Sequence, residues 1–292
     1  MDSTTNNNDW LYTISPKKKL IDLNFKEIWR YRDLLFLFVK RNVITLYKQT
    51  ILGPLWYFIQ PLFTTLTFTL IFNNLANIPT GNGIPAFLFN LAGLSCWNYF
   101  SSCLTGTSNT FKANQGLFAK VYFPRVIMPL STVITNLINF GIRMFLFIGF
   151  YIYFKFFTEV ANLASPNLTL LLLPILILFM ALFGLGFGMI ISSLTTKYRD
   201  LTYLVGFGVQ LLMYGSAVMY PLSYFKEKLP EYSWLVEYNP MTTFIELFRH
   251  MTLGTEAFSL SSFLYAGVVS IVFFLLGLIV FNRTEKTFID TV

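Results

Sequence analysis

Long apolar stretches alternate with short polar ones along most of this sequence. A helix needs about 20 predominantly apolar residues to cross a bilayer, and the chain holds six stretches of roughly that length. The pattern therefore predicts an all-α, polytopic membrane protein with six transmembrane helices. The expected spans are residues 54–75, 86–107, 128–154, 168–192, 201–221 and 263–282.

The segment that precedes the first span has a mixed pattern. Residues 1–24 are polar and predict a cytoplasmic N-terminal tail, whereas residues 25–48 mix apolar and basic positions at roughly helical spacing. Such a segment is too charged to cross a bilayer and too apolar to lie free in water. We expect an amphipathic interface helix over 25–52, lying along the cytoplasmic membrane surface. A solvated helix docked on a partner is the alternative.

Two prolines mark the start of the first span. Gly53 permits a sharp turn, and Pro54 suits the first position of a helix, where a missing N–H costs nothing. Pro61 lies about two turns further on and is expected to bend the helix. Because lipid does not satisfy loose polar groups, Gln60 and Pro61 are expected to face protein or water.

The segment after the fifth span predicts two short helices. Asn239 can cap and Pro240 can start the second, in which apolar residues recur at i, i+3, i+4, i+7 and i+10 from Met241. Their amphipathic pattern is typical of a hairpin that re-enters the outer leaflet. A plain cap on the membrane surface is the alternative interpretation.

Composition and charge distribution support this topology. Of the residues, 55% are hydrophobic and 12% charged, about half the charge of an average soluble domain. Sixteen Lys and Arg fall on the side that includes both ends of the chain and four on the opposite side. The positive-inside rule then predicts that both termini are cytoplasmic. These charges suit contact with anionic membrane lipids, so the net charge of +7 does not require nucleic acid.

The sequence holds no recognisable catalytic motif. It has no P-loop, and all fourteen acidic residues lie outside the six expected spans. Cys96, Cys103 and the single His250 give no metal-site spacing. We expect no catalytic residue, metal or cofactor in this chain, which argues against an ion-coupled carrier or a membrane transferase. Energy for transport would have to come from another subunit.

Polar and aromatic side chains are expected inside the spans. Asn136, Asn139 and Arg143 share one helix face at i, i+3 and i+7, which must point into the bundle. Bonding between helices and contact with an anionic ligand, such as a lipid phosphate, both remain open. The first and fifth spans are rich in aromatic rings, which can stack on sugars or simply face lipid.

Four motifs stand out along the chain: RDLLFLFVKRNVITLYKQTILGPLWYFIQPL, NQGLFAKVYFPRVIMPLS, KYRDL and YNPMTTFIELFR. They resemble the permease subunit of type 2 ABC exporters, and more narrowly the branch that exports O antigen and capsule, with the teichoic-acid exporters close by. The resemblance runs from about Leu20 to the C-terminal tail.

The resemblance implies an architecture and a function. Two copies of the permease, as a homodimer, would work with two copies of an ATPase subunit that binds ATP and Mg²⁺. The complex would move a polysaccharide linked to a lipid diphosphate of the undecaprenyl type from the cytoplasmic to the outer face of the inner membrane. Export of a small hydrophobic molecule, or a membrane-embedded glycosyl or acyl transferase, is the alternative.

The resemblance also implies roles for particular residues within a transmembrane domain over 53–283, followed by a cytoplasmic tail over 284–292. The ATPase-coupling loop spans 112–127 and the outer gate helices span 222–260. The implied coupling residues are Lys120, Val121, Tyr122, Phe123, Pro124 and Arg125; the conduit and lateral-gate residues are Tyr57, Phe58, Gln60, Pro61, Phe68, Tyr203, Phe207, Gln210 and Tyr214; the outer gate residues are Pro221, Asn239 and Pro240.

Overall fold

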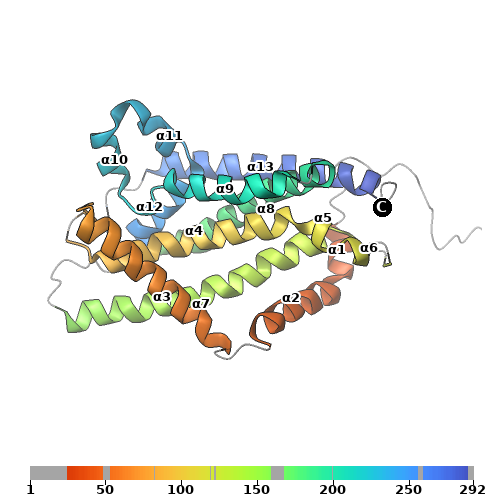
Figure 1. Ribbon diagram of the computed structural model, residues 1–292, viewed down its shortest axis with the longest axis horizontal. Coiled ribbons are helices and arrows are strands. Elements are labelled where there is room, and N and C mark those ends of the chain that lie inside the picture. Colours follow the sequence, from red (N-terminus) through yellow and green to blue (C-terminus); the bar gives the residue numbers. More distant parts are fainter. Residues whose placement is uncertain are drawn as a thin grey trace, which may run out of the picture.

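The described part of the chain is entirely helical in its regular structure. Five long helices run side by side along the molecule's long axis (Figure 1). They are α4 (Ala86–Ser108), α7 (Ile127–Phe157), α8 (Leu173–Lys197), α9 (Leu201–Tyr214) and α13 (Leu260–Phe288). The computed structural model describes residues 25–48, 53–81, 83–118, 120–121, 123–158, 168–198, 200–255 and 259–288.

The bundle is built around α4 and α8. The most extensive contacts join α8 to α13, α4 to α8, and α4 to α7. Glycines allow the α8–α13 contact, since a Cβ added at Gly186 would lie 2.5 Å from the carbonyl oxygen of Phe273. Small residues at such crossings let two backbones approach closely, and dispersion contacts then hold the helices together without a hydrophobic driving force.

The N-terminal segment forms two helices, α1 (Phe25–Arg30) and α2 (Arg32–Tyr47), instead of one helix over 25–52. Tyr31 is the break between them, and α2 packs on α7. On α2, Phe38 and Val39 are buried, whereas other apolar side chains are exposed. The predicted N-terminal tail, residues 1–24, and the last part of the predicted interface helix, residues 49–52, lie outside the described residues.

The expected first span has three parts. The 3₁₀ turn η1 (Gly53–Leu55) begins at a positive φ of 49° at Gly53, as the sharp turn requires. The α-helix α3 (Trp56–Phe68) continues through Pro61, and the π-helix η2 (Thr69–Leu75) follows it. The π-helix was not predicted from the sequence.

Short elements gather at the two ends of the bundle (Figure 1). At one end lie α5 (Thr110–Ala113), α6 (Gln115–Phe118) and α1. At the other lie α10 (Leu222–Lys228), α11 (Ser233–Glu237) and the start of α12 (Pro240–Leu253). Two 3₁₀ turns, η3 (Leu168–Leu172) and η4 (Pro230–Tyr232), precede α8 and α11.

Three of the described helices are long and apolar enough to cross a membrane by length and composition: Ile127–Phe157, Leu168–Lys197 and Leu260–Glu285. The fifth expected span is shorter than 201–221, because α9 ends at Tyr214 and a turn follows. Helix α4 is long but carries many polar side chains, which its central, largely buried position shelters from lipid. Residues 284–288, expected in the tail, continue α13, and 289–292 lie outside the described part.

Candidate functional site

Phe123 of the predicted coupling segment lies in an aromatic cluster at the end of the bundle that holds α5 and α6. Its ring lies 5.8 Å from the rings of Phe38 on α2 and Phe118 on α6. Phe111 and Phe281 stack in the same cluster at 4.6 Å. The cluster therefore joins the N-terminal helix, the predicted coupling segment and the end of α13.

Arg125 is also held inside the chain. Its Nη1 donates to the backbone carbonyl of Glu285 at 2.8 Å, and its guanidinium lies 5.2 Å above the ring of Phe118. The side chain is 5% exposed. Arg125 and Phe123 therefore both brace the segment from within.

The other members of this segment lie nearer the surface. Lys120 and Val121 are exposed, and Pro124 is half-buried. Tyr122 lies outside the described residues. Among the described residues, Lys120 and Val121 therefore form the exposed part of the segment.

The expected conduit residues lie on two helices that flank α4. On α3, Pro61 is buried, Tyr57 and Phe68 are half-buried, and Phe58 is exposed. Gln60, expected to face protein or water, is exposed in this single chain. The rings of Phe68 and Phe72 pack 5.5 Å apart.

Helix α9 carries the other four conduit candidates on a poorly covered surface. Tyr203 is 85% and Phe207 62% exposed, and Gln210 and Tyr214 are exposed as well. Within Leu201–Tyr214, all of it described, no side chain is buried. Helix α9 contacts α4 and α8, and Figure 1 shows α4 between it and α3. One copy therefore presents these two aromatic helices on either side of α4.

A chain of amides fastens the end of the expected first span to α4. Asn90 Nδ2 donates to Asn73 Oδ1 at 2.7 Å and to Thr69 Oγ1 at 3.1 Å. Asn73 Nδ2 in turn donates to the carbonyl of Ile78 at 2.8 Å. These bonds satisfy polar groups within an apolar bundle, as expected for interior amides in membranes.

The three polar residues of α7 lie beside α2 and α3. Asn136 and Asn139 line a pocket of about 500 Å³ between α7 and α2. Arg143 follows one turn after Asn139, and Tyr57 of α3 lies near enough to interact with it electrostatically. Asn139 Oδ1 and Arg143 Nε are buried without a hydrogen-bond partner among the described residues.

At the opposite end, the helix start predicted at Asn239 is confirmed. Asn239 Oδ1 accepts from the backbone N–H of Met241 at 3.0 Å, which caps α12. Its Nδ2 donates to the carbonyl of Gly215 at 2.8 Å and to Ser216 Oγ at 2.9 Å. Pro240 occupies the first turn and is buried, while Pro221 precedes α10 and is half-buried.

The apolar face of helix α12 is buried within the bundle. Its predicted apolar positions are all buried, and the helix packs against α4, α13 and α8. Arg249 on the same helix is fully buried, although its charge suggests an outer loop. Arg249 follows Ile245 by four residues and therefore lies on the same, apolar face of the helix. This spacing in the sequence indicates that Arg249 is buried.

Arg249 is surrounded by acceptors from three segments. Its Nη1 donates to the carbonyl of Ala217 at 2.7 Å and to Glu246 Oε1 at 3.1 Å. Its Nη2 and Nε donate to the carbonyls of Val218 and Phe89 at 2.5 and 3.3 Å. Burial lowers the pKa of this guanidinium from its ordinary value, and Glu246 opposes the shift. The side chain fastens the turn after α9 to α4 and α12.

The sequence matches the ABC-2 type transporter family over residues 33–253. The chain belongs to this family. Family membership assigns it to the membrane component of an ABC transporter, which works with an ATP-binding partner. This agrees with the apolar helices of the bundle and identifies a multi-pass membrane protein.

Similar proteins extend over nearly the whole chain. Two O-antigen export system permease proteins RfbA from Klebsiella pneumoniae are 28% identical over 261 and 264 residues, or 88% of this chain and 94% of each relative. The protein of the same name from Myxococcus xanthus is 26% identical over 271 residues, or 91% of this chain and 98% of that relative.

Proposed function

We propose that this chain is the permease subunit of an ATP-driven exporter for a lipid-linked cell-envelope polysaccharide, such as an O antigen. The polysaccharide would move from the cytoplasmic to the outer face of the inner membrane. The observation that carries this proposal is the similarity, over 88% or more of the chain, to three proteins named O-antigen export permeases. The energy would come from ATP and Mg²⁺ bound to a separate subunit.

The proposed complex contains two copies of this chain and two ATPase subunits. The uncovered surface of α9 supports a second copy, because a helix with no buried side chain contributes little to the fold of one copy. In the proposed topology each copy has six spans with both termini in the cytoplasm, and α10–α12 form a re-entrant hairpin at the outer face. The distribution of basic residues supports that orientation.

The proposed conduit is lined by aromatic side chains of α3 and α9. Exposed rings such as Phe58, Tyr203 and Phe207 can stack on the apolar faces of sugars. The hydroxyl of Tyr203 and the amides of Gln60 and Gln210 can bond to sugar hydroxyls. The two helices lie on opposite sides of α4, so a second copy is needed to enclose a conduit between α3 and α9.

Coupling to the ATPase would use the surface formed by Lys120 and Val121. Phe123 and Arg125 hold the same segment against α2, α6 and α13, so a displacement of the exposed part would reach those helices. Interiors of this kind transmit displacement because they are closely packed. In this proposal, ATP is bound and hydrolysed by the separate ATPase subunit.

The proposal is tested by replacing the chromosomal gene with variants. Disruption should abolish surface polysaccharide and leave the lipid-linked product on the cytoplasmic side, measured on intact and lysed cells with a glycan-specific probe. A Lys120→Glu, Val121→Glu double variant should lose both export and co-purification of the ATPase subunit.

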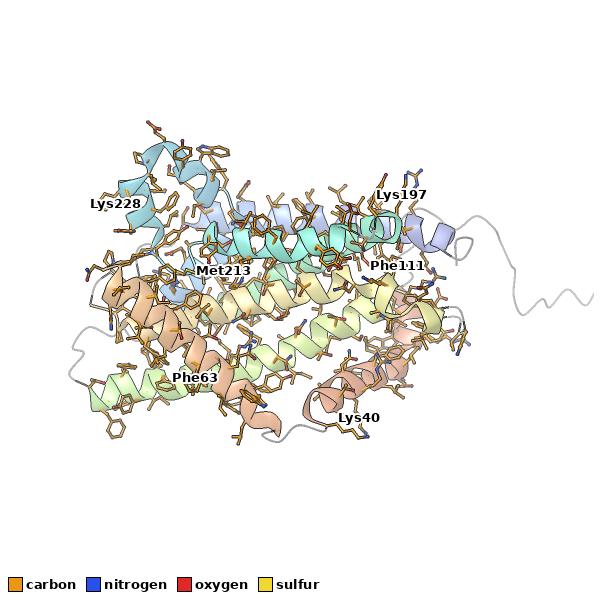
Figure 2. The ribbon with its side chains drawn as sticks, viewed as in Figure 1. Lys40, Phe63, Phe111, Lys197, Met213 and Lys228 are labelled. Carbon is orange, nitrogen blue, oxygen red and sulfur yellow. The ribbon has the colours of Figure 1, made fainter. Side chains whose placement is uncertain are left out.

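The matched control is Lys228→Glu, which changes an exposed lysine at the opposite end of the bundle, as Figure 2 shows. This control should retain the ATPase. Normal surface polysaccharide after disruption of the gene, with loss of export of a small hydrophobic compound instead, would refute the assignment of a polysaccharide cargo.

A further inference from the structure

A polar pocket lies on the side of the bundle between α2 and α7, apart from the surfaces assigned to the ATPase and the conduit. It has a volume of about 500 Å³, and Arg41 and Asn42 of α2 face Asn136 and Asn139 of α7 across it. Threonines of both helices complete the lining. The pocket holds a positive charge and several amides, and no acidic side chain lines it.

Arg41 has donors available for a ligand. Its Nη2 donates one long hydrogen bond, 3.3 Å, to Asn42 Oδ1, and its guanidinium lies 5.0 Å above the ring of Phe38. A guanidinium carries five N–H donors, and Arg41 is exposed at the edge of the pocket. Arginine suits a phosphate because its planar fork can donate two parallel bonds.

A ligand in this pocket must also supply a hydrogen-bond donor to the side-chain oxygen of Asn139. Its Oδ1 is buried without a partner among the described residues, which costs free energy unless a ligand satisfies it. The hydroxyls of Thr132 and Thr135 donate to carbonyls of their own helix, so they offer only acceptor oxygens. A phosphate has acceptors alone. The pocket therefore suits a phosphate that carries hydroxyl groups nearby.

Exposed apolar side chains accompany the pocket on α2, where Leu37 and Ile44 share the helix face of Arg41 at i−4 and i+3. On α2, Phe36, Leu37 and Ile44 are exposed near Arg41. A polar pocket bordered by exposed apolar side chains fits a molecule with a polar head and hydrocarbon tails better than a free anion in water.

We propose that this pocket binds the headgroup of an anionic phospholipid that carries hydroxyl groups, such as phosphatidylglycerol. The phosphate accepts from Arg41 and from the amide N–H groups of Asn42 and Asn139. A headgroup hydroxyl donates to Asn139 Oδ1, and the acyl chains lie along the exposed side chains of Leu37 and Ile44 on α2. The lipid thereby bridges α2 to α7. This inference does not depend on the identity of the transported cargo.

Native mass spectrometry of the full-length chain tests the proposal. The detergent-purified protein is equilibrated with equal amounts of phosphatidylglycerol, phosphatidylethanolamine and phosphatidylcholine, and the retained lipids are counted. Wild type should retain phosphatidylglycerol over the other two. Arg41→Gln and Asn139→Asp should each weaken that retention about tenfold, since each removes or opposes a bond to a charged group.

Lys40→Gln is the matched control, because Lys40 is the exposed basic neighbour that does not line the pocket, on the outer side of α2 in Figure 2. It should retain the lipid as wild type does, and Arg41→Lys should recover part of the retention. Equal losses in Lys40→Gln and Arg41→Gln would overturn the proposal, as would equal retention of all three lipids by wild type.

A competition arm distinguishes two sources of lipid phosphate. A polyprenyl diphosphate-linked sugar should leave the bound phosphatidylglycerol in place. If the lipid-linked sugar displaces phosphatidylglycerol from wild type but not from Arg41→Lys, the lipid-linked sugar is the occupant. That result would overturn the assignment to a membrane phospholipid. The melting temperature of each variant is also measured, so that loss of bound lipid can be told apart from loss of the folded structure.

Discussion

Arg249 places a positive charge in the interior of an apolar bundle, and the groups around it accept its hydrogen bonds. Three backbone carbonyls and the Glu246 carboxylate accept its hydrogen bonds, and the ring of Phe89 lies 3.5 Å below its guanidinium. Ala217, one of the acceptors, has a positive φ of 49°, which is unfavourable for a residue with a Cβ. Arg249 therefore holds a strained turn in place.

Replacing Arg249 with Met should destabilise the fold. The substitution would remove the charge but leave the buried carbonyls of Ala217 and Val218 without their donor. Removing one partner of a buried ionic network costs about 3 kcal/mol or more. Thermal unfolding in detergent should show a clearly lowered transition, whereas Lys228→Met, an exposed site, should leave it unchanged. An unchanged transition for both variants would contradict the structural role of Arg249.

Gly93 of α4 makes room for the same guanidinium. A Cβ at this position would lie 2.6 Å from the carbonyl oxygen of Val218 and would collide with Arg249 Nη2. Gly93→Ala should therefore cost about 1–3 kcal/mol through overpacking. The matched control is Gly141→Ala on α7, where a Cβ would meet no heavy atom of the described residues within 4 Å.

Gly141→Ala should be neutral or stabilising by up to about 1 kcal/mol, because Ala favours a helix over Gly. The two variants can be compared by the same thermal unfolding measurement. Equal stability of the two would show that the space around Gly93 is not filled as described.

Several residue-level properties follow from local rules and were predictable. The cap at Asn239 and the turn at Gly53 depend on neighbouring residues alone. The exposure of Gln60 and the burial of Phe123 depend on which helices pack beside them, which a single sequence does not specify. The burial of Arg249, within the expected outer gate segment 222–260, was not predicted because its acceptors come from segments distant in sequence.

At the scale of elements, long apolar stretches predicted helices well. Their ends were less predictable: α9 stops at Tyr214 and α13 extends to Phe288. The π-helix after α3 was missed because its geometry is coupled to a tertiary contact, the bonds from Asn90 to Thr69 and Asn73. Hydrophobic pattern carries no information on such a contact.

The close crossing of α8 and α13 leads to a test at this scale. A Cβ at Gly186 would lie 2.5 Å from the backbone of Phe273 and Phe274, so Gly186→Ala should push the helices apart and lower stability by about 1–3 kcal/mol. Gly208→Ala on α9, where a Cβ meets no described atom within 4 Å, should leave the unfolding of a single copy unchanged. Equal effects would contradict the α8–α13 packing.

At the scale of the whole molecule, one end of the bundle gathers the short helices beside the predicted coupling segment, and the other holds the α10–α12 hairpin (Figure 1). The aromatic helices α3 and α9 lie between these ends on either side of α4. This arrangement suits a subunit that receives displacement at one end and encloses a conduit only with a second copy. The chain's proposed role is therefore passive, with its energy supplied from outside.

Reconstitution into liposomes tests that role most directly. The chain is inserted alone or together with its ATPase subunit, and movement of a lipid-linked polysaccharide across the bilayer is measured with and without ATP. We predict movement only when both subunits and ATP are present. ATP-independent accumulation of the polysaccharide against a gradient by this chain alone, or chemical modification of it, would contradict the account.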